Sequence, residues 1–259
     1  MKYTQGSYRI TEKTAIARDT FSFTVLCPEI AEIADPGQFV HILPKGYGLR
    51  RPISIAGIDP VGGTLRIVFD VRGKGTEALA GLNVGDDMDM IGPLGHGFTL
   101  LEDAQTVALV GGGIGVPPML PLASYYGEKA VAISGFRSYP QVILQEDLQL
   151  LGAQTILVTE DGTAGDCKGF VTGPLEALLS DGVDAVYACG PMPMLRAVKK
   201  FAQEQGIPAY ISLEERMACG VGACLGCVTK TVKEDGHSRV RNARICTEGP
   251  VFDAEEVEI

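Results

Sequence analysis

Short runs of β-branched and aromatic residues, often alternating with polar ones, fill the first hundred positions of the chain. Turn signals such as Pro36-Gly37 and Gly62-Gly63 separate these runs. The pattern predicts strands over residues 8–17, 20–27, 38–43, 52–57, 64–71 and 87–91, and one short helix over 76–80. Six short strands at this spacing are typical of a small antiparallel barrel.

The pattern changes near residue 102, where short apolar runs begin to alternate with segments of helical periodicity. Such runs are typical of parallel strands that are buried on both faces of a sheet. They predict strands over 106–110, 130–134, 155–158, 185–189 and 209–213, and helices over 118–126, 141–151, 175–179 and 193–205. Elements in this order predict a doubly wound parallel sheet in an α/β nucleotide-binding domain.

The last segment is rich in glycine and cysteine, and its pattern predicts one hairpin, of 228–233 against 240–242. The segment is too short to bury a core of its own, so we expect a bound metal centre to hold it together. The chain therefore divides into a barrel at 1–102, an α/β domain at 103–212 and a metal-binding segment at 213–259.

Composition narrows the classes of function. The 259 residues are 46% hydrophobic and 21% charged, which is typical of a globular chain with more than one domain. The formal net charge of −10 argues against nucleic-acid binding, because that needs a basic face. Glycines and prolines interrupt the uncharged stretch 106–127, so we do not interpret it as a membrane span. With no secretory signal pattern and an odd number of cysteines, we expect a cytoplasmic protein.

Four cysteines carry the strongest chemical signal. Cys219, Cys224 and Cys227 form C-x4-C-x2-C, and Cys246 follows at a distance. This spacing is the plant-type pattern for a 2Fe-2S cluster. The glycines between the cysteines allow the sharp turns that bring thiolates together. A structural zinc site is the alternative, although paired C-x2-C units are its usual signature; disulfides are a further alternative, disfavoured by the odd cysteine count.

Two segments of the barrel could bind phosphate. Arg51-Pro52-Ile53-Ser54 joins a bidentate guanidinium to a hydroxyl. Gly73-Lys74-Gly75-Thr76 begins the short helix, and we expect Thr76 to cap it and its first amides to face a phosphate. On its own the first segment is equally compatible with a surface arginine at a strand edge.

The α/β domain has two candidate sites at strand ends. The turn Gly111-Gly112-Gly113-Ile114-Gly115-Val116-Pro117 follows its first strand, and Cys189-Gly190-Pro191 follows its fourth. Ligands of α/β sheets bind at the carboxyl ends of the strands, so we expect both turns at one nucleotide site. The alternatives are a turn that only connects elements and, for Cys189, a buried core thiol.

Other polar residues suggest no catalyst. His41, His96 and His237 lack metal-ligand spacing, so we expect packing or surface roles for them. We interpret Glu214-Glu215 as a solvated turn. An acid–base catalyst is not needed for hydride transfer between nicotinamide and flavin.

The motifs RPIS, GKGT, GGGIGVPP and CGPMPM occur in the order found in ferredoxin reductase-like flavoproteins, and the chain resembles that family up to about Leu213. The resemblance implies that FAD binds to Arg51, Pro52, Ile53, Ser54, Val68, Phe69, Asp70, Gly75 and Thr76. It also implies that NAD binds to Gly111, Gly112, Gly113, Gly115, Pro117, Gly190 and Pro191, with Cys189 as the catalytic contact of the two rings. At Asp70, where an arginine is common in the family, we expect a contact from the backbone and not from the side chain.

The cysteine segment and its continuation to Phe252 resemble the electron-transfer subunits of type B, NAD-dependent dihydroorotate dehydrogenases. The ligands implied are Cys219, Cys224, Cys227 and Cys246, although the last interval is a few residues longer than in that family. The resemblance implies a heterotetramer, two of each subunit, that acts in pyrimidine biosynthesis. It also implies that a catalytic subunit with FMN oxidises dihydroorotate and that electrons pass through 2Fe-2S and FAD to NAD+.

Two alternatives remain open. The first is another reductase subunit of the superfamily, of the sulfide dehydrogenase or NADH-dependent ferredoxin:NADP oxidoreductase type. Cys219 argues against it, because those tails tend to lack the first cysteine. The second belongs to a different class, a non-catalytic binding module held together by zinc.

Overall fold

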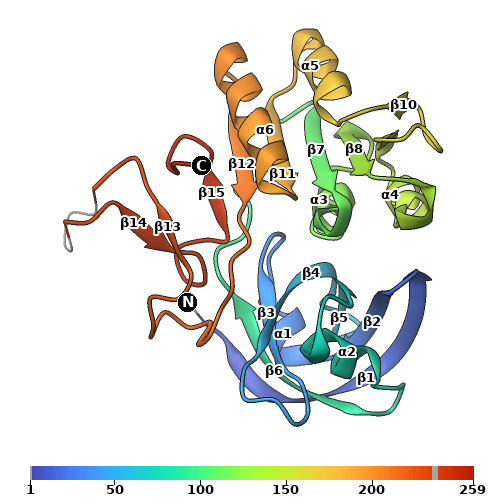
Figure 1. The fold of residues 1–259 in the computed structure, drawn as a ribbon, viewed down its shortest axis with the longest axis vertical. Helices are drawn as coiled ribbons and strands as arrows, with labels where there is room; N and C mark the ends of the chain where they lie inside the picture. Colours follow the sequence, from blue (N-terminus) through green and yellow to red (C-terminus); the bar gives the residue numbers. More distant parts are fainter. Residues whose placement is uncertain (1, 235–238) are drawn as a thin grey trace.

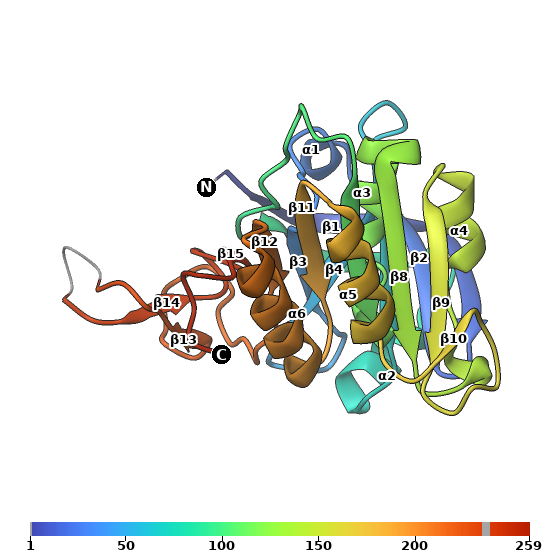
Figure 2. The same cartoon turned by 90° about the horizontal axis from the view of Figure 1, so that it is seen from above.

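The computed structural model describes residues 2–234 and 239–259, so His237 lies outside the described residues. The barrel occupies the lower part of Figure 1 and the α/β domain the upper part, and the C-terminal segment lies beside both. Seen from above, the hairpin of this segment projects away from the sheet (Figure 2).

The predicted barrel is confirmed. Six antiparallel strands close in the order β1-β2-β5-β4-β3-β6. They are β1 (Thr4–Ala17), β2 (Thr20–Leu26), β3 (Phe39–Leu43), β4 (Arg51–Asp59), β5 (Thr64–Asp70) and β6 (Asp87–Leu94). Alternate residues point inward, so side chains such as Phe23, Ile67 and Met90 are fully buried. Two short helices, α1 (Pro28–Ala31) and α2 (Lys74–Ala80), add Ile30 and Leu79 to this core.

The predicted α/β domain is confirmed as well, as a sheet in the order β10-β9-β8-β7-β11-β12-β15. Its parallel strands are β7 (Val107–Gly112), β8 (Ala130–Phe136), β9 (Gln154–Thr159), β10 (Cys167–Lys168), β11 (Ala185–Cys189) and β12 (Ala209–Ser212). The strand order reverses between β7 and β11. A crevice at such a reversal is where sheets of this type bind ligands.

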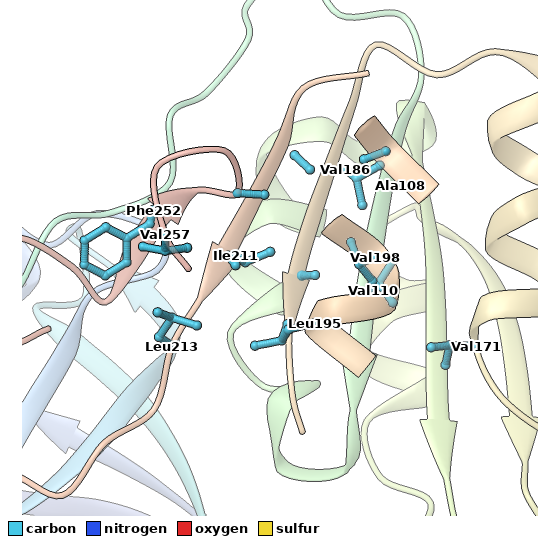
Figure 3. Packing of buried hydrophobic residues seen from close by; sticks show 14 of the residues in the cluster. Ala108, Val110, Val171, Val186, Leu195, Val198, Ile211, Leu213, Phe252 and Val257 are labelled. Atoms are coloured by element: carbon cyan, nitrogen blue, oxygen red, sulfur yellow. The ribbon is translucent and has the colours of Figure 1, made fainter. Parts of the chain in front are cut away.

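Helices cover both faces of the sheet. Short 3-10 turns accompany them at Gly113–Gly115, Gly127–Lys129 and Tyr139–Gln141, and the helices are α3 (Met119–Tyr126), α4 (Gln145–Leu150), α5 (Thr172–Asp181) and α6 (Met192–Gln205). α5 and α6 pack on one face (Figure 3), and α3 and α4 pack on the face that meets the barrel. α4 begins later than the predicted 141–151, because Leu144 has a left-handed φ of 63° that a helix cannot contain. Arg66 of β5 forms an ion pair with Asp147 of α4 across the two domains.

The hairpin of the C-terminal segment is present, but its strands differ from the predicted ranges 228–233 and 240–242. Its strands are β13 (Val228–Lys230) and β14 (Asn242–Arg244). The pairing starts at the cysteines, where the Ile245 amide donates to the Cys227 carbonyl at 2.8 Å. Val232 is taken away from the hairpin because its amide donates instead to the Glu256 carbonyl at 2.9 Å.

The C-terminal segment is also less dependent on a metal than its length suggests. β15 (Val251–Asp253) pairs antiparallel with β12, and so extends the main sheet. Phe252 and Val257 are buried in the same core as Leu213 and the residues of α6 (Figure 3). This part of the segment therefore has a core after all, which it shares with the α/β domain. No helix in the described part of the chain has the length and apolar character needed to cross a membrane.

Candidate cofactor site

A cavity of about 740 Å³ lies where the barrel, the α/β domain and the C-terminal segment meet. The barrel contributes Arg51, Pro52, Ile53 and Ser54 from β4 and Val68, Phe69 and Asp70 from β5. Ile114 of the glycine turn and residues 212–217 line other parts of it. The structure thus brings together most of the residues that the sequence assigned to FAD.

Both segments that were predicted to bind phosphate contribute residues to one recess. A smaller cavity of about 270 Å³ adjoins the first and is lined by Arg51, Arg72, Gly73, Lys74, Gly75 and Thr76. The guanidinium of Arg51 lies so close to Gly75 that a Cβ there would be 2.7 Å from its Cζ. Three cationic side chains therefore surround the start of α2, which favours a phosphate ligand.

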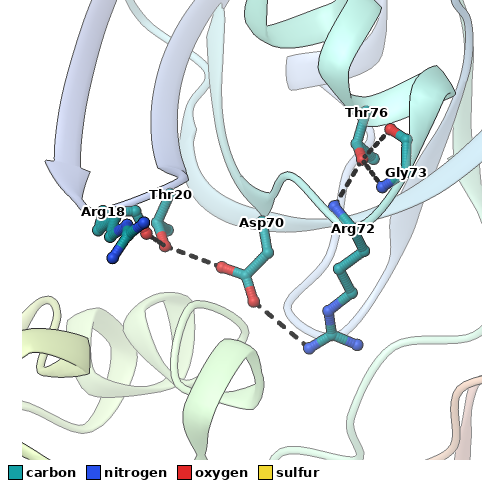
Figure 4. Close-up of polar contacts among 6 residues, drawn as sticks. All are labelled: Arg18, Thr20, Asp70, Arg72, Gly73 and Thr76. Atoms are coloured by element: carbon teal, nitrogen blue, oxygen red, sulfur yellow. Dashed lines mark hydrogen bonds and ion pairs between the residues drawn. The ribbon is translucent and has the colours of Figure 1, made fainter.

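Thr76 does not cap α2 in the way we predicted. The N-cap is Gly73, and Thr76 is the third helical residue. Its Oγ1 accepts from the amides of Arg72 at 2.9 Å and Gly73 at 3.3 Å, and donates to the Gly73 carbonyl at 3.0 Å (Figure 4). Thr76 therefore closes the preceding loop, while the first turn of the helix has no side-chain cap. Uncapped amides at a helix start suit an anion.

The carboxylate of Asp70 is held by its neighbours. It accepts from Thr20 Oγ1 at 2.9 Å and pairs with Arg72 Nη2 at 3.4 Å (Figure 4). These partners reduce the repulsion that an acidic group would exert on a phosphate nearby. The contact of its backbone with FAD stays a prediction.

The glycine turn packs tightly against the turn after β11. Gly111 and Cys189 both lie toward the carboxyl ends of their strands, as predicted, and the structure pairs them as direct neighbours. A Cβ on Gly112 would be 2.7 Å from Pro191, and one on Gly115 would be 2.7 Å from the Gly190 amide. Gly113 has a left-handed φ of 55°, with nothing within 4 Å of its Cβ position. Close packing thus explains why residues 112 and 115 are glycines, whereas Gly113 faces open space.

Cys189 is buried behind the cavity wall. It is 1% exposed, and its sheet neighbour Ser212, which sequence reasoning missed, lines the cavity instead. Burial, followed by the charge of Glu214, raises the pKa of the thiol, and a hydrogen bond with Ser212 opposes the shift. Cys189 is therefore a neutral thiol, and its contact with nicotinamide stays a prediction.

Glu214 and Glu215 are not simply a solvated turn, because both line the large cavity. Glu214 is open to this space, yet the surrounding atoms desolvate it enough to raise its pKa. Arg72 lowers the pKa of Glu214 and Asp70 raises it, which shows that these three side chains influence one another.

The first two cysteines form one pair. The Cys224 amide donates to Cys219 Sγ at 3.4 Å. Burial raises the pKa of Cys219, but hydrogen bonds from the amides of Val221, Cys224 and Ala223 and from the Cys224 thiol outweigh this and lower it to about 7. A thiolate is the form that binds metals, so the loop prepares Cys219 for that role.

Cys227 and Cys246 form the second pair, and both are buried. Burial, followed by a hydrogen bond with the Cys227 thiol, raises the pKa of Cys246 to about 12, and the charge of Cys219 adds to this effect. Within residues 2–234 and 239–259, no group of three or more Cys, His, Asp or Glu side chains is placed to hold one metal ion. Two pairs of thiols fit a cluster of two irons, in which each iron takes two protein ligands.

His41 lies next to the cysteine loop, although no motif spacing in the sequence indicated this position. It lies on β3, fully buried, against the loop that begins at Cys219. Its pKa is lowered to about 4, first by burial and then by the charge of Arg50; contacts with the backbones of Cys219 and Arg50, which fall outside hydrogen-bond geometry, oppose the shift. His96 lies elsewhere, where its amide donates to the Gly249 carbonyl at 2.6 Å.

Comparison with known proteins points in the same direction. The family model of the iron-sulfur cluster binding domain of dihydroorotate dehydrogenase B matches residues 214–258. A protein of Fusobacterium nucleatum, the electron transfer subunit of dihydroorotate dehydrogenase B (NAD(+)), is 41% identical over 96% of this chain and 97% of its own length. The protein of the same name from Shouchella clausii is 39% identical over 99% of both chains.

Solved structures share the fold. The NADH-dependent reduced ferredoxin-NADP oxidoreductase, studied for flavin-based electron bifurcation, has a TM-score of 0.86 and 30% identity, covering 98% of this chain and 90% of that one. A cytochrome P450 reductase from Amycolatopsis has a TM-score of 0.65 and 23% identity, covering 78% of this chain and 66% of that one. The second likeness concerns the fold alone.

Proposed function

The chain belongs to the family of electron transfer subunits of dihydroorotate dehydrogenase B (NAD(+)), and we propose on that premise which residues hold its cofactors and how it meets its partner. It is an NAD-linked oxidoreductase subunit that uses FAD and a 2Fe-2S cluster. When bound, FAD exchanges two electrons with nicotinamide, whereas the cluster exchanges one at a time.

Arg51 and the start of α2 bind the FAD pyrophosphate. The observation that carries this assignment is the placement of the Arg51 guanidinium over Gly75, in a recess with two further cations. Ser54 and β5 line the larger cavity, where they orient the flavin. A fixed guanidinium and uncapped helix amides together recognise a diphosphate without a metal ion.

NAD binds at the strand reversal, over the open space at Gly113 and beside the turn Gly190-Pro191. Cys189→Ala is expected to slow the reduction of FAD by NADH while FAD and iron contents stay unchanged, because the thiol borders the β7 end where nicotinamide would approach the flavin. Stopped-flow absorbance measures this rate. Cys27→Ala, which removes a buried thiol from the barrel core, is the matched control. A parental rate in Cys189→Ala would make Cys189 a packing residue.

The cluster takes Cys219 and Cys224 as one pair of ligands and Cys227 and Cys246 as the other. The pairing of the thiols in the structure supports this division. The amides that donate to Cys219 stabilise its thiolate, and the burial of Cys246 excludes water from the second pair.

The catalytic subunit of dihydroorotate dehydrogenase B is the partner of this chain. We propose further that the partner carries FMN, that two copies of each subunit assemble, and that the complex works in the cytoplasm, which the absence of a disulfide among the seven described cysteines favours. Leu225 is 79% exposed at the tip of the cysteine loop. An apolar side chain so exposed beside an electron carrier suits a protein contact, and we place the partner there.

The purified chain alone is expected to oxidise NADH with artificial acceptors but not to oxidise dihydroorotate. The part of the chain that the structure describes contains one closed barrel, which is the candidate FAD domain, and no second barrel for FMN and substrate. Dihydroorotate-dependent reduction of NAD+ should appear only with the catalytic subunit. Leu225→Asp should weaken this coupled activity and leave NADH oxidation with acceptors intact. Dihydroorotate oxidation by the chain alone would refute the relay.

A further inference from the structure

Two side chains beside the cysteine loop have buried polar atoms without a hydrogen-bond partner. The atoms are Nδ1 and Nε2 of His41 and Oγ1 of Thr247, and no other buried side-chain nitrogen or oxygen in the described residues shares this property. Buried polar groups in folded proteins are nearly always satisfied, so each exception requires a physical explanation. Here all the exceptions adjoin a single loop.

His41 reaches the loop from the barrel. Gly220, the residue after Cys219, has a left-handed φ of 72°, and a Cβ on it would overlap Nδ1 of His41. The imidazole therefore packs directly on the backbone that carries the first ligand. Its strand β3 pairs with β4, His41 lying opposite Pro52, so the same contact joins the cysteine loop to the flavin-binding strand.

Thr247 contacts the same loop from the C-terminal segment. It follows Cys246, and a Cβ on Gly222 would be 2.8 Å from its Cγ2 and 3.4 Å from its Oγ1. Gly222 also has a left-handed φ, of 79°. The two residues with unpartnered polar atoms thus contact the loop at two glycines, each next to or near a cysteine ligand.

We propose that His41 and Thr247 donate hydrogen bonds to the sulfur atoms of the bound 2Fe-2S cluster and so raise its reduction potential. The proposal rests on the cysteine ligands proposed above. Sulfur atoms of such clusters accept hydrogen bonds, and these bonds are among the factors that set the potential. Reduction adds negative charge to the cluster, so a donor stabilises the reduced form more than the oxidised form.

The Thr247→Val and Thr247→Ser pair tests the hydroxyl with minimal change in volume. Both variants are prepared as the full chain with its cofactors, and the potential is measured by redox titration followed by electron paramagnetic resonance. Thr247→Val should shift the ratio of reduced to oxidised cluster about tenfold toward the oxidised form, which is a potential lower by about 59 mV for one electron. Thr247→Ser keeps the donor and should stay near the parental potential.

His41→Leu and His41→Asn form the second pair, in which the amide of asparagine keeps an N–H donor in place of the single N–H of the neutral imidazole. We expect a lower potential in His41→Leu and recovery in His41→Asn, at unchanged iron content. If His41→Leu loses iron, the smaller Thr247→Val change decides the proposal. Parental potentials in the iron-replete variants would overturn it, and the polar atoms would then be satisfied by buried water. Full iron in Cys246→Ser would instead overturn the ligand assignment, so the two failures are distinguishable.

Discussion

Replacing Cys246 by serine is expected to remove the iron of this protein and to loosen the hairpin of β13 and β14. Cys246 is buried against Cys227, and a serine hydroxyl is a poor ligand for iron at neutral pH. The hairpin consists of three residues on each side, too few to be stable without the centre at its base. The absorbance of the cluster should therefore disappear with the iron.

The loss of structure should not extend to the core that the C-terminal segment shares with the α/β domain. β15 pairs with β12, and Phe252 packs among residues of the α/β domain, so its amides should stay protected without the cluster. Hydrogen exchange followed by mass spectrometry separates the two regions, and iron analysis gives the occupancy. Cys167→Ser, in β10 at the far edge of the sheet, is the matched control and should keep its iron. A full complement of iron in Cys246→Ser would remove this residue from the site.

Arg51→Ala is expected to release FAD. A lost hydrogen bond to a charged group costs about 1.5 to 3 kcal/mol, so the dissociation constant should rise roughly tenfold to 150-fold. The side chain is held in place by donating to the Leu49 carbonyl at 2.8 Å and the Arg50 carbonyl at 3.1 Å. Arg51→Lys keeps the charge but loses the planar guanidinium, so its dissociation constant for FAD should lie between those of the parent and Arg51→Ala.

Flavin fluorescence after dilution measures the release of FAD. Arg9→Ala is the control, because Arg9 lies on the barrel surface, with 59% of its side chain exposed, paired to Asp87 across β1 and β6. It removes an equal charge from the same barrel without touching the recess. Retention of FAD in Arg51→Ala equal to that of Arg9→Ala would show that another group holds the pyrophosphate.

Local patterns predicted the fold well where one element depends mainly on its own residues. The six barrel strands and the strands β7, β8, β9, β11 and β12 lie within a few residues of their predicted ranges. The predicted bounds of the hairpin strands were wrong, because the Val232 amide donates to the Glu256 carbonyl instead of continuing the hairpin. The role of Thr76 at the helix start was wrong because its hydroxyl closes the loop before the helix. In both cases the hydrogen-bond partner was a backbone group, and the hydrophobic periodicity of the sequence does not identify such partners.

The barrel, the parallel sheet and the four candidate cysteine ligands could be predicted from the sequence, because alternation, apolar runs and ligand spacing are properties of residues close together in the chain. The folded structure was needed to show that Arg51 lies over Gly75, that Phe252 packs into the core of the α/β domain, and that His41 faces Gly220. These contacts join residues far apart in the chain. They depend on how whole elements pack, because a close-packed core is filled by side chains from several elements and not from one segment.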